Sequence, residues 1–135
     1  MPRSRATEGT LVVGLGIDLI ELDRVEGALD RWGARFVARL MDPAEAARLP
    51  AAEPARSRAL ALAIAGKEAG SKAIGTGWSR GVRWRDVEVV LGDAPRVLFH
   101  HAAAARARAL GSSGLAHVRL EIRGPLALGE VWLLS

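Results

Sequence analysis

The spacing of hydrophobic and polar positions changes several times along this chain, and each spacing predicts an element. Residues 11–20 are apolar and partly β-branched, which indicates a buried strand interrupted by two glycines. Over residues 23–41 apolar side chains recur every three or four positions, as on one face of a helix, and Gly33 interrupts the pattern. Residues 42–49 begin with Asp-Pro, which is typical of the N-cap and first turn of a further short helix.

The second half of the chain opens with its longest predicted helix, at residues 54–74, which is rich in alanine and stops at Gly75. Later segments predict strands at residues 86–91, 96–99, 115–122 and 126–134, and a helix at residues 100–110. Gly-Pro between the last two strands predicts an antiparallel hairpin. This order is of the α+β class. We expect a single domain over residues 10–135, with an antiparallel sheet packed against the long central helix and shorter helices, after a flexible tail at residues 1–9.

Composition narrows the class of protein. The chain has 135 residues and is 50% hydrophobic, which suits one folded domain and argues against disorder. It has no cysteine, which excludes disulfides and thiolate metal sites. No apolar run is long enough to span a membrane, and the basic start is followed by too broken an apolar stretch for a signal peptide. We therefore expect a cytoplasmic protein with no membrane partner.

The charge pattern points to an anionic partner. The formal net charge is +4, which suits a phosphate-rich cofactor, an acidic protein or a nucleic acid, although a solvated arginine-rich surface would give the same value. Of 19 basic residues only Lys67 and Lys72 are lysines, and both lie in the long predicted helix. A lysine ammonium is a compact charge that can lose its proton, unlike a guanidinium. The clustering of the two lysines therefore suggests a site that needs a compact positive charge or a proton donor.

The candidate constellation joins Asp18 of the first strand with Glu68 and Lys72 of the long helix. Positions 68 and 72 lie on one helix face, one turn apart. Mg²⁺ binds few protein carboxylates and takes its other ligands from water and substrate phosphates, which a nearby ammonium would also meet. Two simpler interpretations stay open: Glu68 and Lys72 form a surface ion pair, and Asp18 caps the following helix.

Other motifs carry less information. The loop at residues 75–77 (Gly-Thr-Gly) either lets backbone amides approach an anion or merely stops the helix. Residues 14–16 (Gly-Leu-Gly) lack the third glycine and the parallel βαβ unit of a dinucleotide-binding fingerprint. His100 and His101 are adjacent and cannot share a helix face, so the histidines show no metal-ligand spacing.

The segments that carry this chemistry resemble those of one enzyme family. Residues 14–25 resemble the opening motif of holo-acyl-carrier-protein synthases, a G-I-G-x-D strand followed by an E-x-x-R-I helix start. Residues 67–77 resemble the second signature of the family, K-E-A-x-S-K-A-x-G-T-G, almost throughout. Residues 84–89 resemble its W-x-D-I-E-V strand, and residues 35–45 its R-F-x-x-R-x-L-T-x-x-E segment. The chain is identified as a divergent member of this type of 4′-phosphopantetheinyl transferase.

The resemblance implies the family's fold and reaction. Such enzymes move the 4′-phosphopantetheine arm of coenzyme A onto a serine of an apo acyl carrier protein, release adenosine 3′,5′-bisphosphate and require Mg²⁺. Asp18 and Glu68 are implied to hold Mg²⁺ on the pyrophosphate, and Lys72 to neutralise or protonate the leaving phosphate. These three are the implied catalytic residues. Cofactor binding is implied for Lys67, Ser71, Gly75, Thr76, Arg58 and His117.

Partners follow from the same resemblance. Arg24 and Arg31 are implied to meet the acidic helix of the carrier protein, which would be of fatty-acid or polyketide type. Similar proteins are trimers with active sites at subunit interfaces, so we expect a homotrimer. The general base stays open between a water on the metal, Glu45 and Asp42. No nucleic-acid partner is expected, because aromatic residues are not interleaved with the basic ones.

The chain also departs from the family pattern. Ala63 stands where the family has an arginine that helps to bind coenzyme A phosphates, and Arg56 or Arg58 is the candidate replacement. Ile122 stands where the family has a second histidine. These departures support one alternative to an active transferase, a non-catalytic relative that binds carrier protein or coenzyme A. The other alternative is a basic nucleic-acid-binding module, which the charge alone would allow.

Overall fold

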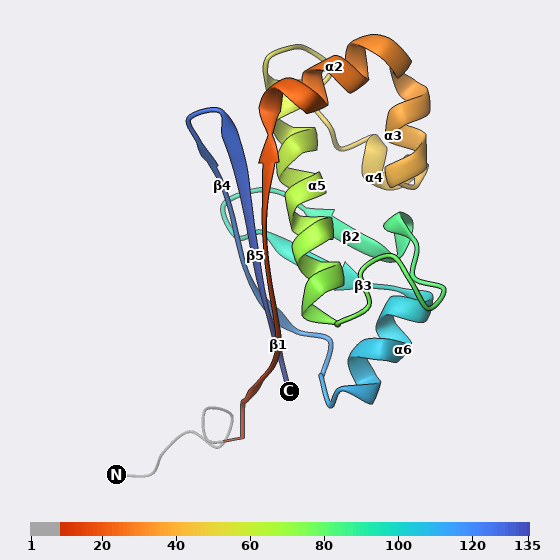
Figure 1. The fold of residues 1–135 in the computed structure, drawn as a ribbon, viewed down its shortest axis with the longest axis vertical. Helices are drawn as coiled ribbons and strands as arrows, with labels where there is room; N and C mark the ends of the chain where they lie inside the picture. Colours follow the sequence, from red (N-terminus) through yellow and green to blue (C-terminus); the bar gives the residue numbers. More distant parts are fainter. Residues whose placement is uncertain (1–8) are drawn as a thin grey trace.

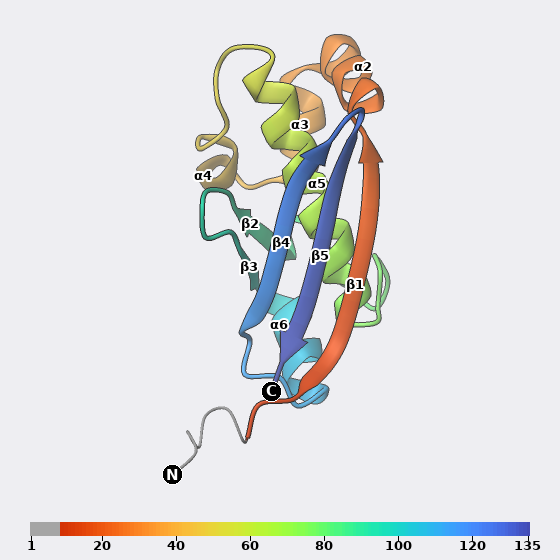
Figure 2. The same ribbon diagram turned by 90° about the vertical axis from the view of Figure 1, so that its left-hand side faces the viewer.

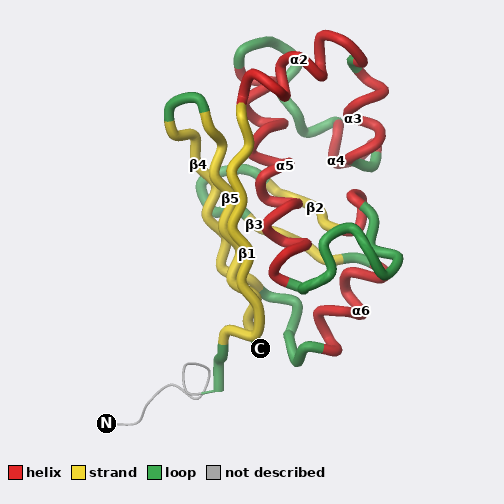
Figure 3. The backbone as a smooth tube through the Cα atoms, in the orientation of Figure 1, coloured by secondary structure: helices red, strands yellow, loops and turns green. Residues whose placement is uncertain are grey.

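The computed structural model describes residues 9–135, so the predicted flexible tail lies outside the described residues except for Gly9. A three-stranded sheet forms one layer, and helices with a short hairpin form the other (Figure 1, Figure 3). The elements in chain order are β1 (Val12–Glu21), α2 (Leu22–Trp32), α3 (Ala34–Leu40), α4 (Pro43–Ala46), α5 (Ala55–Ala73), η1 (Trp84–Asp86), β2 (Val87–Val90), β3 (Arg96–Phe99), α6 (His101–Ala109), β4 (Ala116–Arg123) and β5 (Leu126–Leu134). The predicted α+β class is confirmed.

The three-stranded sheet has the order β1-β5-β4, and both of its strand pairs are antiparallel. The predicted hairpin of the last two strands is present, and the first strand of the chain pairs with the last, Asp18 lying opposite Gly129. β2 and β3 form a separate two-stranded sheet (Figure 1). The short helix predicted over residues 42–49 begins at Pro43 as expected but ends at Ala46, because residues 47–49 form turns.

Helix α5 lies directly on the inner face of the sheet because both surfaces carry small residues at the contact. A Cβ atom built on Gly16 would overlap the carbonyl oxygen of Ala69, and one built on Gly129 would overlap the backbone of Ala65. Ala65 and Ala69 are fully buried. The glycine that interrupts the first strand at residue 16 therefore serves close backbone approach. This contact fixes the position of α5 relative to β1 and β5.

The other side of α5 is also covered, by the β2–β3 hairpin. Gly66 and Gly70 of α5 face the side chains of Val89 and Val87 in β2. A helix buried on nearly all sides has no polar stripe, which explains why alanine and glycine dominate its sequence. Within residues 9–135, no helix combines the length and apolar character needed to cross a membrane.

Figure 2 shows the outer face of the sheet, which is turned away from α5. This face carries an apolar surface that no other element of the described chain covers. On β1 this surface consists of Leu15, Ile17 and Leu19, with exposed fractions of 47%, 49% and 56%. Trp132 of β5 pairs in register with Leu15 and is 36% exposed. Contiguous apolar patches of this kind usually mark an interaction site. The outer face is therefore a candidate for contact with another protein molecule.

The close contact at β1 gives a test of the fold. Gly16→Ala should lower the free energy of unfolding by about 3 kcal/mol, because its methyl group meets backbone rather than a flexible side chain. Gly27→Ala is the matched control, since Gly27 lies in α2 with no atom within 4 Å of an added Cβ and should gain up to about 1 kcal/mol from helix propensity. Urea denaturation measures both. Equal midpoints for Gly16→Ala and the unmutated chain would contradict the close approach.

Candidate active site

The contact between α5 and β1 brings Asp18 and Lys72 together. The Lys72 Nζ atom lies 2.6 Å from Asp18 Oδ1 and donates a second hydrogen bond to the Ile17 carbonyl at 3.3 Å. The side chains of Lys72 and Asp18 are 48% and 19% exposed, so the pair is accessible from solvent. The N-cap of α2 is Glu21, without a side-chain hydrogen bond, and the capping interpretation of Asp18 is therefore wrong.

Glu68 lies one turn before Lys72 on α5 and is partly buried. Burial raises the pKa of the Glu68 carboxyl, and the charge of Asp18 raises it further. The Lys72 ammonium acts in the opposite direction, although its ion pair is with Asp18 and not with Glu68. The indole N–H of Trp78 also favours the charged form of Glu68, while falling short of hydrogen-bond geometry. Asp18, Glu68 and Lys72 thus form one electrostatic group, which we call the carboxylate cluster.

The carboxylate cluster has the chemistry of a site for a hard divalent cation. Asp18 already attracts one cationic group. Burial and the negative charge of Asp18 disfavour the ionised form of Glu68, and a bound cation would offset both effects. Among residues 9–135 no three histidine or acidic side chains gather in a way that could hold a metal ion alone. A cation bound by Asp18 and Glu68 would therefore need further ligands from water or from substrate, as Mg²⁺ commonly does.

The loop after α5 stops the helix and does not offer amides to an anion. Gly75 has a φ of +77°, and its N–H donates to the Lys72 carbonyl at 2.9 Å. The N–H groups of Thr76 and Gly77 both donate to the Ser71 carbonyl, at 3.3 and 3.1 Å. This is the Schellman arrangement of a helix C-terminus. Because these amides are engaged, the helix-stop interpretation is right, and backbone binding of a cofactor by Gly75 and Thr76 has no free donor here.

Lys67 lies in the core and not in the carboxylate cluster. Its Nζ atom donates to Glu45 Oε1 at 2.9 Å, to the Val87 carbonyl at 2.6 Å and to the Trp84 carbonyl at 3.1 Å. Burial lowers the pKa of Lys67, and the nearby Glu45 opposes this effect. All three ammonium donors therefore have protein acceptors, which leaves none for the predicted contact with a cofactor.

Two other predicted side chains are also engaged inside the protein. Ser71 is fully buried, and its hydroxyl donates to the Glu68 carbonyl at 2.8 Å. The second oxygen of Glu45 accepts the Val89 N–H at 3.0 Å, so this carboxylate is not free to act as a general base. Asp42, the other acidic candidate, is 61% exposed and pairs with Arg85 at 3.5 Å.

Arg58 and His117 do not reach the carboxylate cluster within one chain. Arg58 is exposed in the first turn of α5, about 15 Å along the helix axis from Glu68. His117 is exposed on β4, opposite Trp132, and so projects from the outer face of the sheet. Asp18 lies against α5 on the other side of that sheet. These two predicted cofactor contacts would therefore require a second subunit.

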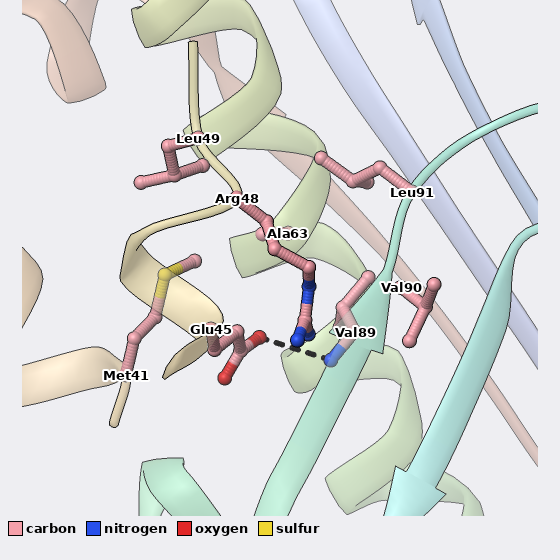
Figure 4. A pocket seen from close by; sticks show the side chains of 8 residues that line it. All are labelled: Met41, Glu45, Arg48, Leu49, Ala63, Val89, Val90 and Leu91. Atoms are coloured by element: carbon pink, nitrogen blue, oxygen red, sulfur yellow. Dashed lines mark hydrogen bonds between the residues drawn. The ribbon is translucent and has the colours of Figure 1, made fainter. Parts of the chain in front are cut away.

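A residue that the sequence argument missed lies beside Ala63. The guanidinium of Arg48 enters a small cavity of about 80 Å³ that Ala63 and Val89 line (Figure 4). There it donates to Glu88 Oε2 at 2.6 Å, while His100 meets the other Glu88 oxygen at 2.8 Å. Burial raises the pKa of Glu88, but these two hydrogen bonds outweigh it and lower the pKa overall. An arginine thus lies close to the position from which the family arginine is missing, and only the folded structure reveals it.

Comparison with known proteins identifies the family. The pattern of the 4′-phosphopantetheinyl transferase superfamily matches residues 14–121, most of the chain. The chain belongs to this superfamily. The holo-[acyl-carrier-protein] synthase of Solidesulfovibrio magneticus, one of its relatives, is 47% identical over 106 residues, covering 76% of this chain and 83% of that protein. The synthase of Solibacter usitatus is 41% identical and covers 88% of this chain and 94% of its own. The resemblance drawn from the sequence motifs is confirmed.

Solved structures of transferases in this superfamily share the fold. The holo-[acyl-carrier-protein] synthase of Neisseria meningitidis superimposes with a TM-score of 0.79 at 25% identity, covering 91% of this chain and 98% of that one. A Bacillus anthracis synthase in complex with coenzyme A (3′,5′-ADP) superimposes with a TM-score of 0.69 at 30% identity, covering 91% and 96%. The matched region of the superfamily includes both strand and helix of the carboxylate cluster.

The contrast between the two lysines of α5 gives a second test. Lys67→Met should lower the free energy of unfolding by about 3–5 kcal/mol, because it leaves the buried Glu45 carboxylate without its counter-charge. Lys72→Met on the same helix should change it by no more than about 1 kcal/mol, since the Lys72 side chain is half exposed and both partners reach solvent. Guanidinium denaturation measures the free energy of unfolding of both variants. A Lys67→Met protein as stable as Lys72→Met would contradict the core assignment.

Proposed function

We propose that this chain transfers 4′-phosphopantetheine from coenzyme A to a serine of an apo acyl carrier protein, releases adenosine 3′,5′-bisphosphate and requires Mg²⁺. The carboxylate cluster carries this proposal, because it places two carboxylates and one mobile ammonium at one accessible junction of strand and helix. Membership of the superfamily and the names of relatives as holo-[acyl-carrier-protein] synthases support it.

The residues of the cluster have separate tasks in this reaction. The serine hydroxyl gives its proton to a water molecule as its oxygen forms a bond to the phosphorus that carries pantetheine. The bridging P–O bond of the pyrophosphate breaks, and adenosine 3′,5′-bisphosphate leaves. Asp18 and Glu68 would hold Mg²⁺, which would neutralise negative charge on the pyrophosphate. Lys72 is half exposed and joined to the protein by a flexible stem, so its ammonium can shift from Asp18 to the departing phosphate oxygen. Phosphoryl transfer depends mainly on such positioning and charge neutralisation.

The surface of α2 and α3 is the proposed docking site for the carrier protein. Arg24 and Arg31 are exposed on α2, and the Arg31 guanidinium lies 5.2 Å from the centre of the Trp32 ring. A groove of about 560 Å³ continues this surface, with Phe36 and Trp32 among its apolar lining and Arg35 beside them. An apolar groove with an arginine rim fits an acidic amphipathic helix.

We further propose a homotrimer whose active sites lie at subunit interfaces. The uncovered apolar surface on the outer face of the sheet, at Leu15, Ile17 and Leu19, supports association. Association also offers the only route by which His117 and Arg58 could join the carboxylate cluster of a neighbouring chain. The number three rests on the family resemblance. The cytoplasm, where we place the protein, would supply both substrates.

The catalytic proposal is tested with two substitutions that remove charge and keep shape. Asp18→Asn and Glu68→Gln should each lower the rate of transfer of labelled pantetheine to an apo carrier protein by more than about 100-fold, since losses of even indirect metal contacts reach that size. Chelation of Mg²⁺ should abolish transfer. Asp93→Asn, in the exposed turn after β2, is the control and should keep full activity. Full turnover by both variants would contradict the site assignment. Binding of coenzyme A by the unmutated chain without any transfer would favour a non-catalytic relative.

The docking proposal is tested by charge reversal. Arg24→Glu and Arg31→Glu should each raise the KM for the carrier protein by about tenfold and leave the KM for coenzyme A unchanged, because only the carrier surface meets these side chains. The effect should shrink at high salt. Arg96→Glu on β3, exposed and outside the groove, is the control. Equal increases in the two KM values would count against docking on α2.

A further inference from the structure

Trp78 carries a buried donor with nothing to donate to. Its indole nitrogen, Nε1, is buried and has no hydrogen-bond partner. Every other buried side-chain nitrogen or oxygen among residues 9–135 has one. Buried polar groups are nearly always satisfied, so such an exception calls for a reason. The residue lies in the loop that follows α5, close in sequence to the carboxylate cluster.

The indole ring is held firmly although its N–H is free. It stacks on Trp84 with ring centres 4.0 Å apart and an angle of 22° between the planes. Trp84 is fixed in turn, because its carbonyl accepts a hydrogen bond from the buried ammonium of Lys67. The position of the Trp78 N–H is therefore set by packing and by the core, and not by a hydrogen bond of its own.

Glu68 is the acidic group beside this N–H. The two groups interact electrostatically without reaching hydrogen-bond geometry. Lys67 and Glu68 are neighbours on α5, so two consecutive helix residues engage the tryptophan pair, Lys67 through Trp84 and Glu68 through Trp78. A rotation of the Glu68 carboxylate that brings one of its oxygens to this N–H would leave its second oxygen free.

We propose that Trp78 is a positioning residue: its indole N–H donates to one oxygen of Glu68 and turns the other oxygen toward a divalent cation shared with Asp18. This inference rests on the proposed function, because it uses the same carboxylate cluster. Carboxylates that bind metals are commonly oriented by a hydrogen bond from a neighbouring group, and the loss of such a group typically lowers metal affinity about 10–100-fold. Trp78 supplies that hydrogen bond from a rigid support.

The test compares two conservative variants, with Mn²⁺ as the probe. Trp78→Phe keeps a ring for stacking and removes the N–H, whereas Trp84→Phe changes the other ring of the same stack. Binding of Mn²⁺ is followed by the electron paramagnetic resonance signal of the free ion, without coenzyme A or carrier protein. Trp78→Phe should weaken Mn²⁺ binding by about tenfold or more, and Trp84→Phe by less than about twofold. In the transfer assay, the Mg²⁺ concentration for half-maximal rate should rise by the same factor, with the KM for coenzyme A at saturating Mg²⁺ unchanged.

A second measurement needs no variant. The chain has four tryptophans, so ¹⁵N-labelled indoles give four N–H signals. Addition of Mg²⁺ should move the Trp78 signal downfield as its hydrogen bond forms, and leave the Trp32 and Trp132 signals in place. Unchanged Mn²⁺ affinity in Trp78→Phe, equal losses in both variants, or a Trp78 signal that Mg²⁺ does not move would each overturn the role of Trp78 while the metal site stands. If the unmutated chain bound no Mn²⁺, the proposed metal site would fail, and the role of Trp78 with it.

Discussion

The direct contact between the backbones of α5 and the inner face of the β1–β5 pair is the constraint on which the rest of the structure depends. Gly16 and Gly129 admit the helix to a distance that any side chain would prevent. At that distance the end of the Lys72 side chain reaches Asp18 and the neighbouring Ile17 carbonyl. The carboxylate cluster therefore depends on packing: the glycines of the sheet let α5 come close, and this close approach brings Asp18 and Lys72 together.

The same helix separates a buried polar pair from an accessible one. Lys67 and Lys72 are five residues apart, so their side chains leave α5 in directions that differ by about 140°. One points into the core, where Glu45 and two carbonyls receive it, and the other points to the cluster and to solvent. The buried pair ties α4 to α5 and β2, which in turn hold the Trp84 carbonyl and the tryptophan stack. The core and the carboxylate cluster are thus connected through Lys67 and Glu68, which are consecutive residues of α5.

Much of this arrangement follows from the sequence, because the signals concerned are local. Apolar spacing, the Gly-Pro turn and Gly75 predict the order of the elements and the end of α5. The helix predicted over residues 42–49 is shorter than expected, and the first strand, predicted as buried, is covered on one face only. The pairing of Asp18 with the Glu68–Lys72 helix was predicted from motifs and not from spacing, since residues 18 and 72 meet only through the fold. Spacing also could not tell that Lys67 is buried while Lys72 is exposed, because the helix is covered on nearly all sides and lacks a polar stripe. The roles of Arg48 and Trp78 cannot be predicted from local sequence, because Arg48 meets Glu88, and Trp78 approaches Glu68, only through the fold.

We propose that Asp18 and Glu68 share a divalent cation that neutralises the pyrophosphate of coenzyme A. A crystal of this chain grown with Mn²⁺ and coenzyme A, measured at the manganese absorption edge, addresses it directly. The account predicts an anomalous peak in contact with one oxygen of each carboxylate and with the pyrophosphate. A bound coenzyme A whose pyrophosphate is held without a metal, or a peak that touches neither Asp18 nor Glu68, would contradict it.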